Sequence, residues 1–210
     1  PSEFILVCDG PLNIELEKVI EKYSELFPKI FKVYRLSKNG GLGEALNYGL
    51  KKCMYEIIAR SDSDDICVAE RFEKQIEFLK NNRDVAVLGT AIDEFDSDPN
   101  KRVFLKLLPT NSVELYEFAK FRSPLNHMSV MFRKSVVQSV GSYMHMKYLE
   151  DYYLWLRILI AGHKIANLSD VLVHARIGNG MIYRRSSREY ISGWERLSRY
   201  MLEEKMINKA

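Results

Sequence analysis

The sequence predicts an α/β protein built on a layered, mixed but mostly parallel central sheet. Short apolar runs typical of buried strands alternate with amphipathic segments of helical period as far as Asp96. Two of these runs end in acidic residues, and a Gly-rich turn precedes one of the helices. Strands joined by helices in this order form parallel sheets with helices on both faces, so we expect three layers, α/β/α.

The expected elements can be placed by their residue ranges. In the first part of the chain, strands are expected at 4–8, 31–36, 55–60 and 85–92, and helices at 14–27, 42–53 and 68–79. Val68, Phe72, Ile76 and Leu79 define the apolar face of the last of these helices. After Asp96, strands are expected at 103–107, 128–132, 164–168 and 171–176, and helices at 113–121, 150–161 and 186–205.

Composition and charge limit the function classes. The 210 residues suit one domain with an appendage, so we expect a main domain at 1–182 and a basic amphipathic helix at 183–210. The net charge of +3 lies wholly in this tail. A neutral body argues against a nucleic-acid partner, whereas the tail could contact an anionic membrane surface. Three scattered cysteines favour a reducing, cytoplasmic compartment.

The acidic cluster after the strand expected at 55–60 is the strongest functional signal. Asp62, Asp64 and Asp65 follow Arg60 at the expected carboxyl end of that strand, where open α/β sheets bind ligands. Neighbouring carboxylates repel one another unless a cation lies between them, and hard oxygen ligands suit Mg²⁺ or Mn²⁺. The alternative is an acidic turn in which Asp65 caps the next helix.

Three further segments could each have either a functional or a purely structural role. The turn Asn39-Gly40-Gly41-Leu42-Gly43 precedes a helix and could bind a phosphate, or it is a plain turn. It does not match a P-loop. Glu150 and Asp151 open a helix, where acids are favourable to the helix dipole or could supply a general base. His127 is expected to be a packing or hydrogen-bonding residue, although it lies in a polar turn that could face a substrate.

Taken in order, these segments resemble the family 2 glycosyltransferases, which have the GT-A fold and use nucleotide-sugar donors. The resemblance extends to about Arg176 and rests on ordered motifs. These motifs are Asp9-Gly10, the segment from Asn39 to Leu50, the segments Ala59 to Asp65 and Glu70 to Gln75, the segment His127 to Arg133, Gly141 to Tyr143, and Glu150 to Arg157.

The resemblance assigns roles to residues of this chain. It implies that Asp64 is the metal ligand of the DxD motif and that Asp62 faces the metal and the nucleotide ribose. Asp65 matches the next acid of the family motif. It also implies that Asp151, with Glu150 beside it, is the general base that deprotonates the acceptor hydroxyl. The remaining donor-binding positions implied are Asp9, Asn39, Gly41 and Arg60.

The implied activity is inverting transfer of a sugar in polysaccharide or cell-surface glycan biosynthesis. The expected partners are a nucleoside-diphosphate sugar, a UDP-sugar first, a saccharide or lipid-linked saccharide acceptor, and Mn²⁺ or Mg²⁺. Cys8 replaces an acid that the family usually carries. The family also has a strand and helix upstream of Phe4, so the resemblance implies that about 25–30 residues are missing.

Alternative functions remain open at this point. The acidic cluster would also serve a metal-dependent nucleotidyltransferase, and a domain that binds a nucleotide-sugar without turnover would retain most of the motifs. The C-terminal helix either docks peripherally at the inner membrane face through its basic and aromatic residues, or packs against the sheet or the second subunit of a homodimer.

Overall fold

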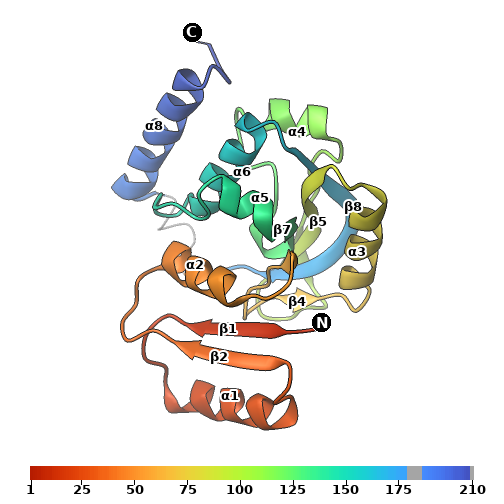
Figure 1. Cartoon of the computed structure of the whole chain (residues 1–210), viewed down its shortest axis with the longest axis vertical. Coiled ribbons are helices and arrows are strands. Elements are labelled where there is room, and N and C mark those ends of the chain that lie inside the picture. Colours follow the sequence, from red (N-terminus) through yellow and green to blue (C-terminus); the bar gives the residue numbers. More distant parts are fainter. Residues whose placement is uncertain (179–185, 209–210) are drawn as a thin grey trace. The chain divides into compact units, whose positions relative to one another are not determined.

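The computed structural model describes residues 1–178 and 186–208 (Figure 1). Contacts along the chain divide it into two units, residues 1–56 and 57–210. The domain boundary expected at 182 and the tail residues Arg184, Arg185 and Lys209 lie outside the described residues.

The first unit is a two-stranded parallel sheet with two helices. Strand β1 (Phe4–Cys8) pairs in parallel with β2 (Phe31–Arg35), and α1 (Ile14–Leu26) connects them. Helix α2 (Leu42–Lys52) packs against β1, and Gly49 permits this contact because a Cβ there would lie 3.2 Å from Cγ2 of Val7. The order of these elements is the one predicted.

The second unit is built on a six-stranded mixed sheet. The strand order is β3-β7-β5-β8-β4, and β6 pairs with β5. The strands are β3 (Ile57–Ala59), β4 (Ile66–Cys67), β5 (Val85–Phe95), β6 (Arg102–Lys106), β7 (Met131–Arg133) and β8 (Lys164–Arg176). The two closing strands expected at 164–168 and 171–176 form one strand, β8, with register shifts against β5.

The α/β fold class with a mixed central sheet is confirmed, although more of its strand pairs are antiparallel than expected. β5 and β8 are parallel, whereas β3 and β5 both run antiparallel to β7, which lies between them. β3, β5 and β8 therefore share one direction, as their helical connections require. The short strand β7, which follows the 3-10 turn His127–Ser129, lies between β3 and β5 and runs in the opposite direction. The sequence pattern does not predict this position of β7.

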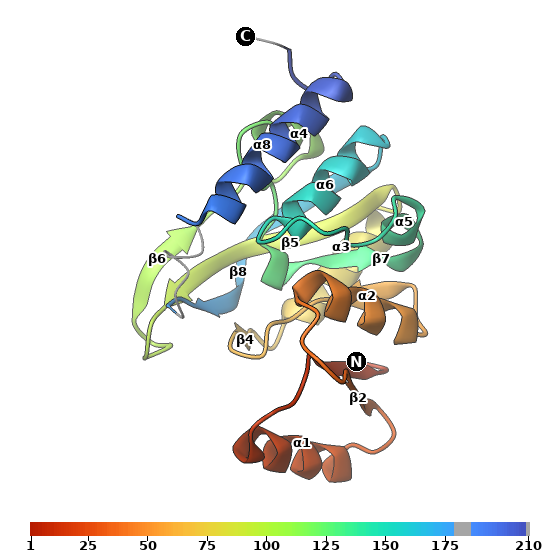
Figure 2. The same cartoon turned by 90° about the vertical axis from the view of Figure 1, so that its left-hand side faces the viewer.

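Helices cover both faces of this sheet. Helix α3 (Arg71–Asn81) lies on one face, and α4 (Ser112–Phe118) and α6 (Glu150–Ile160) lie on the other (Figures 1 and 2). The short helix α5 (Lys134–Ser139) follows β7. Along α6, residues 154–159 are all buried, so this helix forms the centre of the core on its side.

The apolar face expected for α3 is wrong in part. Arg71, Gln75 and Leu79 are the buried residues of this helix, whereas Ile76 is exposed. Phe72 is only partly buried, against the cluster around Leu79. The helix instead turns Arg71 and Gln75 inward, because these side chains donate hydrogen bonds to buried backbone carbonyl groups.

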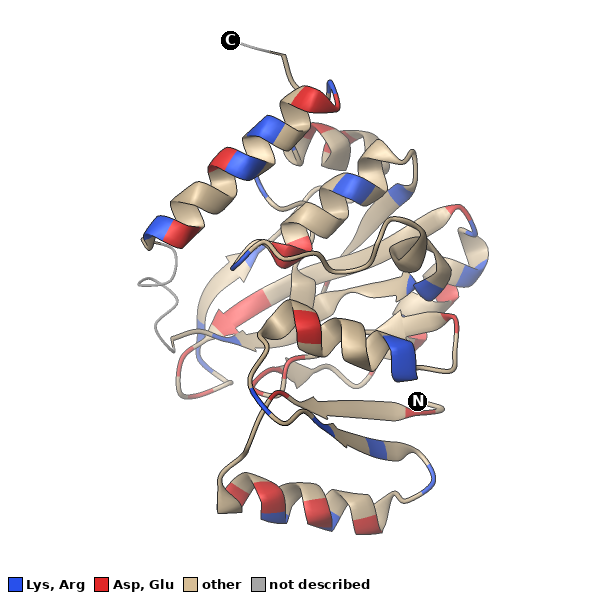
Figure 3. Ribbon diagram, turned by 60° about the vertical axis from the view of Figure 1, so that its left-hand side comes forward, with Lys and Arg blue, Asp and Glu red and all other residues tan. Residues whose placement is uncertain are grey.

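Helix α8 (Arg188–Glu203) packs its aromatic residues onto α6. Trp194 contacts Tyr152 edge to face at 5.4 Å between ring centroids, and Tyr200 contacts Tyr153 in the same way at 5.1 Å. Acidic and basic residues both occur along the helix (Figure 3).

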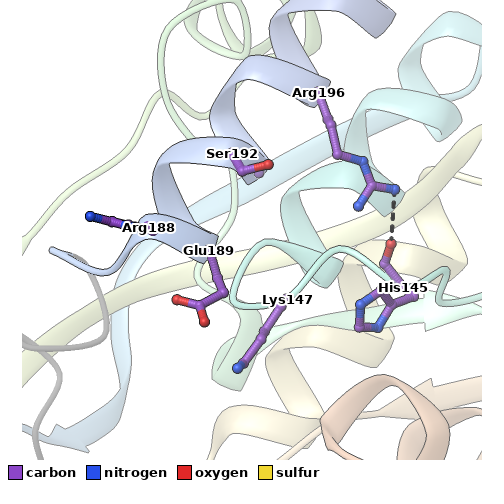
Figure 4. A pocket seen from close by; sticks show the side chains of 7 residues that line it. His145, Lys147, Arg188, Glu189, Ser192 and Arg196 are labelled. Atoms are coloured by element: carbon purple, nitrogen blue, oxygen red, sulfur yellow. Dashed lines mark hydrogen bonds between the residues drawn. The ribbon is translucent and has the colours of Figure 1, made fainter.

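A pocket lies beside the first half of α8. His145, Lys147 and Arg196 border it, and Arg196 donates a hydrogen bond to the carbonyl of His145 (Figure 4). Among the described residues, no helix is long and apolar enough to cross a membrane.

Candidate active site

The acidic cluster forms a compact group of carboxylates in the second unit. The loop between β3 and β4 brings one oxygen each of Asp62, Asp64 and Asp65 within 4.8 Å of one another. Arg60, which directly follows β3 and is almost fully buried, forms an ion pair with Asp62. The structure therefore brings together four of the predicted residues on one short loop.

Asp65 shows that this group suits a cation. Its Oδ1 accepts a hydrogen bond from the backbone amide of Arg176 at 2.9 Å, whereas its Oδ2 is buried without a hydrogen-bond partner. A buried carboxylate oxygen without a partner is energetically costly, and a hard divalent cation would satisfy it. Oxygen ligands from the three aspartates match what Mg²⁺ or Mn²⁺ prefers.

Burial and mutual repulsion act in the same direction on these carboxylates. Burial raises the pKa of Asp62, and the neighbouring Asp64 carboxylate raises it further, while Arg60 opposes both. Burial also raises the pKa of Asp65, against the hydrogen bond from Arg176. Carboxylates with raised pKa values at close range are stabilised in their ionised form by a bound cation.

Arg71 braces both ends of the acidic loop from inside the protein. Its guanidinium donates to the backbone carbonyl of Arg60 at 2.7 Å and to the Sγ of Cys67 at 3.0 Å, which are the residues on either side of the loop. Gln75, one turn later on α3, accepts from Arg71 Nε at 3.0 Å. The Gln75 amide in turn donates to the carbonyls of Leu88 and Ser129, so the brace is anchored in the sheet.

Glu150 and Asp151 form the first turn of α6 and are half-buried. Burial raises the pKa of Asp151, whereas the backbone amide of Tyr152 and the positive charge of Arg60 lower it. Burial likewise raises the pKa of Glu150. Because Arg60 also acts on Asp62, one guanidinium lies in the electrostatic range of both the acidic cluster and the first turn of α6.

A buried aromatic group lies beside these acids. His127 Nε2 is 3.0 Å from the hydroxyl of Tyr143, and the His127 ring packs edge to face on Trp155 at 5.9 Å between centroids. Burial lowers the pKa of His127 well below its usual value, and the charge of Arg60 lowers it further. The imidazole is therefore neutral at physiological pH, and it packs against Tyr143 and Trp155.

In the first unit, Asp9, Asn39 and Gly41 come together in one turn. Asp9 accepts from the backbone amides of Gly40 at 2.8 Å and Gly41 at 2.9 Å, and Asn39 Oδ1 also accepts from Gly41 at 3.1 Å. Gly41 has φ of 90°, a conformation that favours glycine. The turn brings together residues that the sequence separates by about thirty positions.

Comparison with known proteins identifies the family. The family model "Glycosyl transferase family 2" matches residues 1–191. The chain belongs to the family 2 glycosyltransferases. AmsE of Erwinia amylovora, an amylovoran biosynthesis glycosyltransferase, is 44% identical to it over 96% of this chain and 74% of its own length. An Escherichia coli protein named UDP-Gal:alpha-D-GlcNAc-diphosphoundecaprenol beta-1,3-galactosyltransferase is 37% identical over 90% of this chain and 68% of its own length.

Solved structures confirm that this family 2 glycosyltransferase has the GT-A fold. S. aureus TarS 1-349 in complex with UDP-GlcNAc matches with a TM-score of 0.74 and 21% identity, over 95% of this chain and 57% of that one. The mannosyltransferase PcManGT from Pyrobaculum calidifontis, in complex with GDP-Man and Mn²⁺, matches with a TM-score of 0.69 and 14% identity, over 100% and 57%. The glycosyltransferase thus spans little more than half of either solved chain.

Sequence reasoning missed the brace behind the acidic loop. Arg71 and Gln75 were noticed only as part of a family motif, and an apolar stripe on the same helix concealed them. Their spacing of four residues, continued by Leu79, places all three on one face of a helix, and this was the available signal. The contact between Arg176 and Asp65 joins residues 111 positions apart, and no local pattern predicts it.

Proposed function

We propose that this family 2 glycosyltransferase transfers a sugar from a nucleoside-diphosphate sugar to an acceptor hydroxyl with inversion at the anomeric carbon. The observation that carries the proposal is that oxygens of Asp62, Asp64 and Asp65 lie within 4.8 Å of one another, with Asp62 paired to Arg60, whose charge also lowers the pKa of Asp151 in the same unit. A carboxylate cluster that would hold a cation and a half-buried carboxylate that would act as base supply the two functions that displacement of a diphosphate requires.

In this proposal Asp151 is the general base. Its carboxylate takes the proton of the acceptor hydroxyl while that oxygen forms a bond to the anomeric carbon. The bond from that carbon to the diphosphate oxygen breaks, and the electron pair leaves with the nucleoside diphosphate. Asp62, Asp64 and Asp65 would hold Mn²⁺ or Mg²⁺, which when bound neutralises charge on the diphosphate. Glu150, beside the base, is proposed to orient the acceptor.

The donor and acceptor classes are supported by the relatives. The E. coli relative is named for UDP-Gal and a diphosphoundecaprenol-linked sugar, so a UDP-sugar and a lipid-linked saccharide are the first substrates to test. Asp9, Asn39 and Gly41 are proposed to contact the nucleotide, and Arg60 to orient the donor beside Asp62. These assignments rest on the family motif and on the hydrogen bonds within each unit.

A thermal-shift experiment tests donor binding. The chain would be heated with UDP, GDP, CDP or dTDP, each with and without Mn²⁺, and compared with Asp64→Asn. We expect a Mn²⁺-dependent rise in melting temperature with UDP that the variant loses. Asp84→Asn, an exposed acid paired with Lys164, is the matched control and should retain the rise. If no nucleotide raises the melting temperature of the unaltered chain, the donor assignment is wrong.

Asp151→Asn separates an enzyme from a domain that only binds the donor. The amide keeps the shape of the side chain but cannot accept the proton, so transfer should fall about 10²–10⁴-fold. The melting-temperature rise with UDP and Mn²⁺ should persist, because the base does not contact the diphosphate in this proposal. Transfer at the rate of the unaltered chain would exclude Asp151 as the base.

A further inference from the structure

A pocket of about 360 Å³ lies between the first half of α8 and the segment that precedes α6 (Figure 4). This volume is within the range of small-molecule sites, about 300–1,000 Å³. None of its lining residues belongs to the acidic cluster or to the first turn of α6. The residues that line this α8 pocket are His145 and Lys147 from the segment before α6, and Arg188, Glu189, Ser192 and Arg196 from α8.

Close packing of α8 against this segment forms the pocket. Gly193, the remaining lining residue, is buried, and a Cβ there would lie 2.9 Å from Cδ1 of Leu149 and 3.8 Å from the carbonyl oxygen of Lys147. Glycine therefore permits this approach without displacement of Leu149. Between these two residues, Tyr148 has φ of 69°, a conformation that non-glycine residues rarely adopt and that occurs more often at functional sites.

Positive charge dominates the lining of the pocket. Lys147, Arg188 and Arg196 contribute three cations, against the single acid Glu189. Within residues 1–178 and 186–208, none of these three cations forms an ion pair with a carboxylate. The Glu189 carboxyl has its pKa lowered first by its own backbone amide and then by the charge of Lys147. Three cations and one acid leave an excess of two positive charges at the pocket.

These cations match phosphate better than a carboxylate. A guanidinium group can hydrogen-bond two oxygens of one phosphate, and an ammonium group binds phosphate as a point charge. A diphosphate ester carries more charge and more acceptor oxygens than a carboxylate, so it can pair with several cations at once. The hydrogen bond from Arg196 to the carbonyl of His145, at 3.4 Å, holds one guanidinium next to the segment that carries Lys147.

The pocket adjoins the proposed acceptor side of the active site. Lys147 precedes Glu150, which is proposed to orient the acceptor, by three residues. Burial raises the pKa of the Glu150 carboxyl, and the charge of His145 opposes this, so the pocket and the first turn of α6 lie within electrostatic range of each other. A saccharide that reaches Asp151 would therefore have its neighbouring groups beside the α8 pocket.

We propose that the α8 pocket binds the phosphate groups of the acceptor, a saccharide diphosphate ester, while the saccharide itself reaches Asp151. That the ligand is the acceptor rests on the proposed function, whereas the pocket and its charge do not. The diphosphate of the donor is a poorer match, because in the proposed function its charge is met by a cation at the acidic cluster.

Isothermal titration calorimetry tests the pocket without donor, metal or transfer. The chain in EDTA, which keeps cations off the acidic cluster, would be titrated with geranyl diphosphate, inorganic pyrophosphate and uncharged geraniol. We expect both diphosphates to bind and geraniol not to bind. Failure of both diphosphates to bind would overturn the proposal. Binding of pyrophosphate alone would indicate a site for an inorganic anion and would contradict the acceptor assignment.

Variants place the binding in the pocket. Lys147→Gln and Arg196→Gln should each weaken the binding of geranyl diphosphate about tenfold, because each removes a charged hydrogen-bond donor. Arg196→Lys should be affected less, since it retains the charge but loses the fork. Arg199→Gln removes the same charge from an exposed position of α8 that does not line the pocket, and it should bind within about twofold of the unaltered chain. Equal weakening in Arg199→Gln would show that overall charge, and not the pocket, attracts the ligand.

Transfer kinetics identify the natural ligand as acceptor or donor. With a saccharide diphosphate ester as acceptor, Lys147→Gln should raise the acceptor KM about tenfold, with kcat and the donor KM changed less than about twofold. Loss of the Mn²⁺-dependent melting-temperature rise with UDP in this variant would place the pocket in the donor site and contradict the proposal. Because the calorimetry needs no transfer, failure of the proposed function and failure of the pocket give different results.

Discussion

Arg71 holds the backbone carbonyl of Arg60 at 2.7 Å from a helix that begins only after the acidic loop has ended. The loop that contains the aspartate cluster is thereby closed by one buried guanidinium, which also contacts Cys67. This arrangement ties the geometry of the proposed metal site to a residue that touches neither metal nor substrate.

Replacement of Arg71 by Ala should lower the free energy of unfolding by about 2–4 kcal/mol, because buried acceptors lose their donor. Arg71→Lys should recover only part of this loss, since one ammonium group cannot reproduce the guanidinium geometry. Urea unfolding measures both changes. Lys74→Gln, which removes an exposed ion pair with Asp170 on the same helix, should cost less than about 1 kcal/mol. Equal losses at the two positions would contradict the bracing role.

Loss of one carboxylate should weaken cation binding directly. We expect Asp64→Asn to lower Mn²⁺ affinity at least about tenfold, because the charge and number of oxygen ligands set the affinity of such sites. Titration of Mn²⁺ followed by electron paramagnetic resonance, in the presence of UDP, measures free and bound ion. Asp170→Asn, which replaces an exposed acid of β8 that pairs with Lys74, should bind like the unaltered chain. Equal affinity in Asp64→Asn would exclude Asp64 as a ligand.

The rate of transfer should depend on pH through Asp151. Burial raises the pKa of this carboxyl, and a base acts only when ionised, so the rate should fall as the pH decreases through that raised value. The acid limb should therefore lie above the ordinary aspartate pKa of about 3.9. Arg60→Gln should move the limb to higher pH, since Arg60 lowers this pKa. The profile of kcat at saturating donor measures the shift.

Two outcomes would count against this account of Asp151. Arg122→Gln removes the same charge from an exposed position and should leave the acid limb unchanged. A limb that moves to lower pH in Arg60→Gln, or that moves equally in both variants, would show that the charge of Arg60 does not act on the base.

His127 should make the fold sensitive to acid. Its folded pKa is well below the usual value, so between the two values the unfolded chain binds a proton that the folded chain does not. Stability should therefore fall as the pH decreases below about 6.5, by at most about 1.4 kcal/mol per pH unit from this group. Urea unfolding of His127→Gln should show a shallower decrease, whereas the exposed His145→Gln should retain the slope of the unaltered chain.

Much of this fold could be predicted from residue pattern alone. The helix Glu150–Ile160 and the strand at Phe4–Cys8 have strong local signals, and the structure places both where they were expected. The strand expected at 55–60 is shorter, since only Ile57–Ala59 pairs with β7. The insertion of β7 between β3 and β5 depends on contacts between distant residues, and periodicity carries no information about them.

The candidate site could likewise be predicted only in part from the sequence. The aspartate cluster was visible because its carboxylates are adjacent in the sequence. Arg71 and Tyr143 were noticed only within family motifs, and Lys106, whose charge lowers the pKa of Asp151, was not identified, because each belongs to another element and has an ordinary local context. One alternative for the C-terminal helix was packing against the sheet or a second subunit; in the structure Trp194 and Tyr200 of this helix pack on Tyr152 and Tyr153 of α6 instead.

The turn that Asp9 closes determines which ligand groups it can accept. Two successive amides, at Gly40 and Gly41, already donate to the Asp9 carboxylate, so the start of α2 holds an internal anion. A phosphate arriving there would meet a like charge and amides that are already occupied. The same carboxylate can still accept from a ring N–H or a ribose hydroxyl. This turn is therefore suited to discriminate among nucleosides rather than to hold their phosphates.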